Sequence, residues 1–442
     1  MKARRPLSVI PYYGGKAKMA GIIAERLDYS VPTFMTMFGG ACRELLNKDP
    51  HAIEIYNEYN PCLCALIETL SKPDTAQELI DRLYYETEPT ESQFAQAKDL
   101  YDRCNLGLDD FIEMEADRLG QFLLAEGLVT ESDKGRGGKK LERLLLEMLR
   151  AAQLVGEEDC DVEFSARCSQ LLEDITKRDT PDFKKAFIEN AKLLDDLVRI
   201  QRTGGSIPRY QDIADETITD CDMAVAAYLV HTLSFSSIGG HFSKDKVSTD
   251  QAYRKRILTL YDCAERLKGV TVWNMDAMSF FVQKKYEEYA GGLCGSDASY
   301  KDSLFYSLLN NPDVMMFADP SYISPEDEAK FLKGIGDISG IDTGKGETVC
   351  GAIEACRADG KMPKNLGKVY ARSFGYREQE KFLQGIQNAK CKLMVCNYDL
   401  QLYDKYLTPG KGWVKETFET TTSVSARTSK SNKRLEVIWR NY

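Results

Sequence analysis

The pattern of apolar and polar residues divides the chain into three parts. In the first part, short apolar runs at 33–37 and 52–56 predict buried strands, and residues 16–27 have the spacing of a helix. A glycine turn at 39–40 follows the first run, and Asn60-Pro61 predicts a helix start capped by the asparagine. Strand, glycine turn, helix and strand in this order indicate the opening of a doubly wound sheet.

The second part, residues 73–219, shows no strand signal and is richer in charge. Its apolar residues recur at helical spacing, as at Leu141, Leu144 and Met148. We therefore predict a helical insertion between strands of the sheet.

The strand pattern returns in the third part, after residue 220, where an apolar helix is predicted at 224–235. Further strands are predicted at 270–273, 314–318, 393–396, 414–421 and 435–439. The last two are expected to form a hairpin, and the glycine-rich stretch 323–367 to form a mobile loop. The predicted fold class is α/β: a doubly wound, mostly parallel sheet with a C-terminal antiparallel hairpin, built from residues 1–72 and 220–442.

Composition excludes several classes of protein. The 442 residues are 43% hydrophobic and 29% charged, as in an ordinary globular protein. No apolar run approaches the roughly 20 residues that span a bilayer, so a cytoplasmic protein is expected. Thirteen cysteines without a repeated CxxC spacing, and three histidines, predict reduced thiols and no metal site.

The net charge of −10 argues against a nucleic-acid partner, but clustered basic residues can override the total. Basic clusters occur at 134–140, 244–256 and 427–434. A solvated loop is the commoner role of such a cluster, and contact with DNA phosphates is the alternative. The candidate DNA contacts are Lys244, Arg254, Lys255 and Arg427.

The strongest chemical motif is Asp319-Pro320-Ser321-Tyr322, which follows the apolar run 314–318. The carboxylate can accept hydrogen bonds from an amino group, and the proline fixes the turn and leaves its carbonyl available. The tyrosine ring can stack on a planar base. This combination suits methylation of the exocyclic amine of adenine or cytosine, although an Asp-Pro turn after a strand is by itself common.

Three other segments at predicted strand ends could bind a nucleotide-like cofactor. Gly39 and Gly40 let a ligand approach the backbone at a helix start, although a lone glycine pair is usually an ordinary turn. Glu58 follows the glycine turn by about twenty residues, where an acid commonly accepts from ribose hydroxyls. Asp276 follows a third strand and could bind the adenine amine of a cofactor, cap the next helix, or both.

Together these segments resemble the Dam-type DNA adenine methyltransferases, phage and prophage members in particular, which use S-adenosylmethionine. The resemblance rests on motif order: PYYGGK at 11–16, FGG at 38–40, the acid Glu58, an insertion, and Asp-Pro-x-Tyr at 319–322. The segments 43–48, 235–243, 397–399 and 436–442 also look like parts of these enzymes. The resemblance covers residues 8–72 and 220–442 and leaves the insertion unmatched.

The resemblance implies a class I, Rossmann-like methyltransferase fold and transfer of a methyl group to the N6 amine of an adenine flipped out of double-stranded DNA. It implies that the insertion recognises the target, and that the protein is a nucleoid-associated monomer, with a dimer on DNA as the alternative. A restriction-modification, a phage and a regulatory role all stay open. The implied cofactor residues are Tyr13 and Lys16 at the methionine end, Phe38, Gly39 and Gly40 in the cradle, Glu58 at the ribose and Asp276 at the adenine. The implied catalytic residues are Asp319 and Pro320, which receive the target amine, and Tyr322, which stacks on the base.

The chain departs from the family pattern at three places. Ser321 stands where a second proline is usual, Thr36 where an acid is usual, and Ala41 or Cys42 where a glycine is frequent. Two alternatives remain, and Thr36 and Ser321 motivate the second of them. One is a methyltransferase acting on cytosine N4, RNA adenine or a protein glutamine, and the other is a catalytically silent module that grips DNA.

Overall fold

The structure is a computed structural model and divides the chain into two compact units, residues 1–102 with 218–442, and residues 103–217. The described residues are 6–12, 16, 19–134, 138–153, 162–178, 180–203, 209–213, 217–237, 239–244, 249–277, 307–325, 328–329, 331–332, 374–421 and 433–442.

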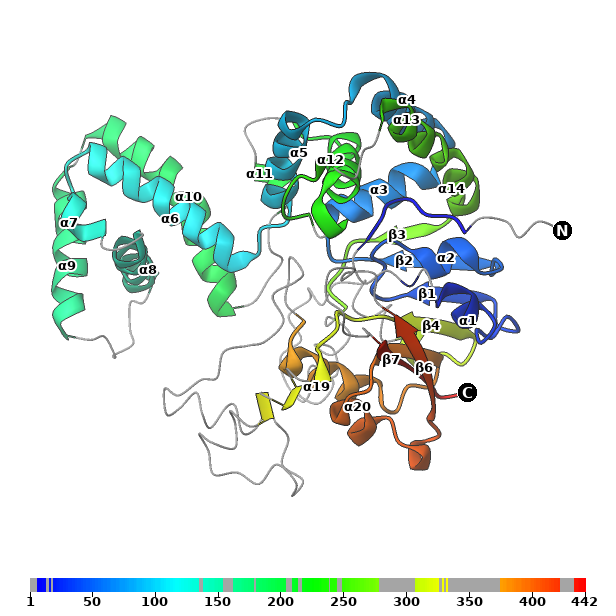
Figure 1. Ribbon diagram of the computed structural model, residues 1–442. Coiled ribbons are helices and arrows are strands. Elements are labelled where there is room, and N and C mark those ends of the chain that lie inside the picture. The colour runs from blue at the N-terminus through cyan, green and yellow to red at the C-terminus, as the bar shows by residue number, and fades with distance from the viewer. Residues whose placement is uncertain are drawn as a thin grey trace. The chain divides into compact units, whose positions relative to one another are not determined.

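The first unit is built on a seven-stranded sheet with the strand order β3-β2-β1-β4-β5-β7-β6 (Figure 1). The strands are β1 (Thr33–Thr36), β2 (Ile53–Asn57), β3 (Thr271–Trp273), β4 (Val314–Ala318), β5 (Lys392–Tyr398), β6 (Val414–Thr421) and β7 (Lys433–Arg440). The first five strands pair in parallel, whereas β7 pairs antiparallel with both β5 and β6. The predicted mostly parallel sheet with a terminal hairpin is confirmed.

The central strands are buried because helices cover the sheet. Every residue of β1 and of β4 is buried, as expected for parallel strands that are covered on both faces. Phe382, Leu383 and Ile386 of α19 belong to the same core cluster as Leu393 and Val395 of β5. The helices of this unit are α1 (Ala20–Ala24), α2 (Arg43–Asn47), α3 (Pro61–Ser71), α4 (Pro73–Glu86), α5 (Glu91–Cys104), α12 (Asp220–Leu233), α13 (Asp250–Leu258), α14 (Leu260–Leu267), α19 (Tyr376–Ile386) and α20 (Gln401–Tyr406).

The order in which strands are added to the sheet reverses between β1 and β4. From β1 the sheet grows to one side through β2 and β3, and the strands that come later in the sequence, β4 and β5, lie on the other side. At such a switch point the loops at the carboxyl ends of the two neighbouring strands diverge and leave a crevice, the usual ligand site of open α/β sheets. The segments that follow β1, β2 and β4 are therefore the candidates for a ligand site.

The second unit is helical in its described residues. Its helices are α6 (Leu108–Ala125), α7 (Glu131–Lys134), α8 (Lys139–Gln153), α9 (Val162–Lys177), α10 (Pro181–Thr203) and α11 (Tyr210–Ile213). Leu119, Leu145 and Leu194, from three of them, share one buried core cluster. This cluster explains why the region shows helical but no strand periodicity.

The insertion begins later than the sequence pattern predicts. Its predicted start is residue 73, but 73–102 belong to the first unit. The reason is the apolar face of α4, where Leu79, Ile80 and Leu83 are buried and the helix packs on α3 and α12. Helical periodicity shows that such a face must be covered, but not which helices cover it.

The helix cap at Asn60 is as predicted, whereas the bounds of two helices differ from the prediction. Asn60 caps α3 through its side chain, with Pro61 at the first helical position, as predicted. The helix predicted at 16–27 is shorter, Ala20–Ala24, and the one predicted at 224–235 spans Asp220–Leu233. Most of the predicted loop 323–367, and the loop between the hairpin strands, lie outside the described residues.

The cysteines and helices of the described residues bear on the predicted class of protein. The nine cysteines described are buried, and no disulfide joins any two of them. None of the described helices combines the length and apolar character needed to cross a bilayer. The described part of the chain also holds no cluster of three histidine, cysteine or acidic side chains placed to bind a metal.

Candidate active site

The turn after β1 requires its two glycines. A Cβ atom at Gly39 would lie 2.1 Å from the ring of Tyr56, a contact that no side chain can make. Gly40 has a φ of +48°, in the left-handed region that glycine adopts most easily, and its carbonyl accepts a hydrogen bond of 2.8 Å from the Tyr56 hydroxyl. The ring of the β2 tyrosine thus fixes the backbone of the turn that leads into α2.

Glu58, just beyond β2, holds the same turn from the other side. Its Oε2 accepts the Gly40 amide at 2.8 Å, and its Oε1 accepts the Asn60 amide at 3.0 Å. Burial raises the pKa of this carboxyl, although the amide donors oppose the shift. A carboxylate has about four acceptor positions, so Glu58 retains capacity for further hydroxyl donors.

The loop after β3 is tied to this acid. Asn274 donates through Nδ2 to the carbonyls of Glu58 and Tyr59, at 2.9 and 2.8 Å. Asp276 follows two residues later and is partly exposed. The helix that Asp276 was predicted to cap falls outside the described residues, so the structure shows only that Asp276 follows Asn274, the residue bonded to the loop after β2.

Asp319, at the carboxyl end of β4, forms an ion pair with Lys16. The Lys16 Nζ lies 2.9 Å from Asp319 Oδ1 and 3.6 Å from Glu436 Oε2, with the lysine almost completely buried. Burial alone would lower the pKa of Lys16, but the two carboxylates outweigh it and raise the pKa above its ordinary value. Burial raises the pKa of Asp319, and the lysine counteracts only part of this effect.

Tyr322 closes the same group of side chains. Its hydroxyl donates to Glu436 Oε2 at 3.0 Å, and Lys16 Nζ lies over its ring, 4.0 Å from the centroid. The edge of Tyr398 packs against it with centroids 4.6 Å apart. The Ser321 carbonyl accepts from Gln379 Nε2 at 2.8 Å, which fixes the turn between Asp319 and Tyr322.

A third carboxylate lies close to this group. Glu44 of α2 is buried, and burial raises its pKa to about 7, with the charge of Asp319 adding to the shift and that of Lys16 opposing it. We call Lys16, Glu44, Asp319 and Glu436 the carboxyl-end cluster. It contains three carboxyl groups and one ammonium group, so it favours an additional cation or amine donor.

Sequence reasoning identified Lys16 and Asp319 but missed the other two members of this cluster. Glu436 lies opposite Tyr398 in the β5–β7 pair, and this register carries it to the carboxyl end of the sheet. Glu44 has the signal of an acid in the first turn of α2, which a helix start alone explains.

The remaining cofactor candidates lie in different surroundings. Phe38 packs edge-on against Phe374 and Phe382, at centroid distances of 5.2 and 5.5 Å, and so contributes to the core at this end of β1. Tyr13 lies outside the described residues.

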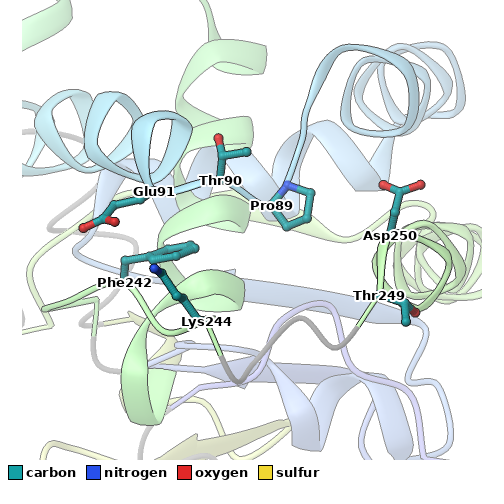
Figure 2. A pocket seen from close by; sticks show the side chains of 7 residues that line it. All are labelled: Pro89, Thr90, Glu91, Phe242, Lys244, Thr249 and Asp250. Atoms are coloured by element: carbon teal, nitrogen blue, oxygen red, sulfur yellow. The ribbon is translucent and has the colours of Figure 1, made fainter.

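The predicted DNA contacts do not form a uniform basic face. Arg254 is engaged internally, because it donates to the Tyr84 carbonyl and forms an ion pair with Asp250 at 3.2 Å. Lys255 is exposed. Lys244 borders a hollow of about 310 Å³ that Glu91 also lines (Figure 2). Arg427 lies outside the described residues.

Comparisons with known proteins add no family assignment. The chain matches no protein-family model and has no significant match among curated proteins. The assignment of function therefore depends on the geometry of the site.

Proposed function

We propose that the protein is a class I S-adenosylmethionine-dependent methyltransferase that acts on the N6 amine of adenine in double-stranded DNA. One observation carries the proposal. Asp319, Pro320 and Tyr322 follow β4, the strand adjacent to β1, whose carboxyl end bears the Gly39-Gly40 turn held by Glu58. A group that accepts from an amine and a turn suited to a nucleoside thus open at the same edge of the sheet.

The residues present fit S-adenosylmethionine. Glu58 is held at both oxygens by backbone amides yet retains acceptor capacity, which suits the hydroxyls of a ribose. The excess of carboxyl groups in the carboxyl-end cluster suits a positively charged sulfonium. When bound, the cofactor supplies an electrophilic methyl group.

The chain's own residues would prepare the acceptor nitrogen. Asp319 and the Pro320 carbonyl would accept hydrogen bonds from the amine, which favours a more tetrahedral and nucleophilic nitrogen. Tyr322 is fixed by Glu436 and Tyr398, and a flipped base would stack on its ring. Because Lys16 Nζ lies over this ring, the base would have to use the opposite face or displace the lysine. Lys16 pairs with Asp319 in the structure, so an incoming amine must share or displace this contact.

The identity of the methylated atom tests the proposal. Unmethylated DNA is incubated with the protein and labelled S-adenosylmethionine, digested to nucleosides and analysed for N6-methyladenine. Asp319→Ala is expected to abolish the product. Asp313→Ala, which changes an exposed acid just before the other end of β4, is the matched control and should retain activity.

The other outcomes identify the alternatives. N4-methylcytosine would move the target to cytosine, and methylated RNA or protein in place of DNA would change the substrate class. Cofactor binding without transfer to any of these would indicate a silent module. Full activity of Asp319→Ala would remove the catalytic assignment.

A further inference from the structure

A buried histidine connects residues 58–60, which we call the acid loop, to a second hairpin of the first unit that follows α12. His231 of α12 is 4% exposed. Its Nε2 lies 3.0 Å from the Tyr101 hydroxyl of α5, and its Nδ1 lies 3.3 Å from the Ser237 carbonyl oxygen. The Tyr101 hydroxyl lies 2.6 Å from Asn60 Nδ2.

The chemistry of the groups fixes the direction of every hydrogen bond in this network. The Ser237 carbonyl can only accept, so the Nδ1 of the histidine donates. Burial lowers the pKa of His231 to about 4, so the ring is neutral near pH 7 and its Nε2 accepts from Tyr101. The tyrosine oxygen then accepts from Asn60 Nδ2, and the Asn60 Oδ1 remains to accept the Leu63 amide at 3.0 Å, as the cap of α3 requires.

One end of the network reaches the cradle by two routes. The first route runs through Asn60, whose backbone N–H donates to Glu58, the acid that holds Gly40. Through ring contact, Tyr12 packs on His231 with centroids 5.0 Å apart, and a Cβ at Gly40 would lie only 3.2 Å from the Tyr12 ring.

The other end holds the hairpin formed by residues 234–237 and 239–243. Its two arms are joined by the bridge between Ser234 and Phe242 and by a hydrogen bond of 2.8 Å from the Phe235 amide to the His241 carbonyl. Ser237 has a φ of +57°, an unfavourable conformation for serine that its surroundings must hold in place. The bond from His231 reaches the carbonyl of this strained residue.

We propose that His231 is a positioning residue that couples the geometry of the acid loop, residues 58–60, to that of the hairpin, residues 234–237 and 239–243. Because the links are directional and buried, a change at one end alters the restraint at the other. One consequence rests on the proposed function and on the predicted DNA contact at Lys244, the residue that follows the hairpin: S-adenosylmethionine and DNA should influence each other's affinity reciprocally through His231.

Hydrogen exchange followed by mass spectrometry tests the coupling without any assay of activity. In His231→Phe, peptides covering residues 38–63 and 233–244 should both exchange about fivefold faster or more, because the lost hydrogen bonds restrained both. Tyr101→Phe keeps the ring and removes only the hydroxyl, and it should have the same effect on both peptides. The double variant should add little to either single change, because each breaks the same link.

Tyr253→Phe is the matched control. It removes a buried tyrosine hydroxyl that lies 2.6 Å from the Thr87 hydroxyl, outside the network. Exchange in the two peptides should stay at the wild-type rate in this variant. If His231→Phe does not fold, Tyr101→Phe decides the question alone.

Faster exchange confined to 233–244 in both variants would overturn the proposal, because the histidine would then support only the hairpin.

Titration calorimetry gives the second readout. DNA should change the Kd for S-adenosylmethionine in the wild type, and this effect should fall by about fivefold in Tyr101→Phe. A protein that binds no S-adenosylmethionine would refute the proposed function, whereas the exchange result would still decide the coupling.

Discussion

Two groups of charged side chains at opposite ends of the sheet differ in balance. The group at the amino end of β2, which we call the amino-end cluster, comprises Lys48, His51, Glu54 and Arg266. Arg266 binds both oxygens of Glu54, at 2.6 and 3.0 Å, and Lys48 pairs with the same carboxylate. Although burial opposes it, these cations lower the pKa of Glu54.

The carboxyl-end cluster has the opposite imbalance. One ammonium group, that of Lys16, serves Asp319 and Glu436, and Glu44 is buried nearby. Burial raises the pKa values of Asp319 and Glu44, and the single lysine offsets only part of the rise. A buried carboxylate with two cations is a satisfied structural element, whereas an excess of buried and partly buried carboxyl groups is typical of a site that awaits a cation or an amine.

Neutralising one acid in each cluster should separate activity from stability, and this is the largest expected effect. Asp319→Asn should lower kcat at least about a thousandfold, because a neutral amide is a weaker hydrogen-bond acceptor for the target amine than a carboxylate. The same variant should leave the free energy of unfolding nearly unchanged. Glu54→Gln should lower the free energy of unfolding by about 3 kcal/mol, because it leaves the buried Lys48 and the partly buried Arg266 without their countercharge. Methyl-transfer kinetics and urea unfolding of both variants give the comparison, and a loss of stability in Asp319→Asn equal to that in Glu54→Gln would contradict it.

The pH dependence of stability should reveal the unsatisfied acid at the carboxyl end. The folded state holds the proton of Glu44 up to a pKa of about 7, above the ordinary value of 4.5. The free energy of unfolding should therefore fall as pH rises from about 4.5 to about 7, by on the order of 3 kcal/mol from this group. Glu44→Gln should remove this slope and be the more stable protein at pH 8. Urea unfolding of both proteins at pH 5 and pH 8 measures the change of stability with pH. An unchanged pH dependence in Glu44→Gln would show that Glu44 is not the group responsible.

Glu436→Gln should show an intermediate effect on catalysis. The carboxylate holds Lys16 and the Tyr322 hydroxyl, so its loss should lower kcat by about tenfold to a hundredfold while the KM for S-adenosylmethionine changes less. Glu416→Gln is the matched control on the neighbouring strand, where the acid pairs with Arg26 and Arg440 on that sheet edge. Equal kinetics in the two variants would show that Glu436 has no special part in the site.

The smallest effect is expected at the proposed DNA contacts. Reversing the exposed Lys255 to Glu should weaken DNA binding by about fivefold and reduce the salt slope by about one, as for the loss of one phosphate contact. Arg254→Glu should mainly lower stability, because this side chain is bound to Tyr84 and Asp250. Binding titrations at several salt concentrations measure the DNA affinity and its salt slope, and urea unfolding measures the stability of Arg254→Glu. Unchanged DNA affinity in Lys255→Glu would show that Lys255 does not contact DNA.

Local sequence signals predicted the strands because each one follows from composition within a few residues. The run at 314–318 is apolar throughout and forms a strand that is buried throughout. The cap at Asn60 and the turn at Gly39-Gly40 were predicted for the same reason. The boundary of the insertion was not, because residues 73–102 are placed by packing on distant helices.

The sequence by itself determined a mostly parallel sheet, a glycine turn, and an acid and an aromatic residue at the end of β4. Only the tertiary structure decided which charges meet, since Lys16, Glu44 and Glu436 come from separate elements that the strand order and the register of β7 carry to one edge. The physical reason is range: backbone preferences act between neighbours in the chain, whereas the pKa of a carboxyl depends on every charge within a few ångströms, wherever it lies in the sequence.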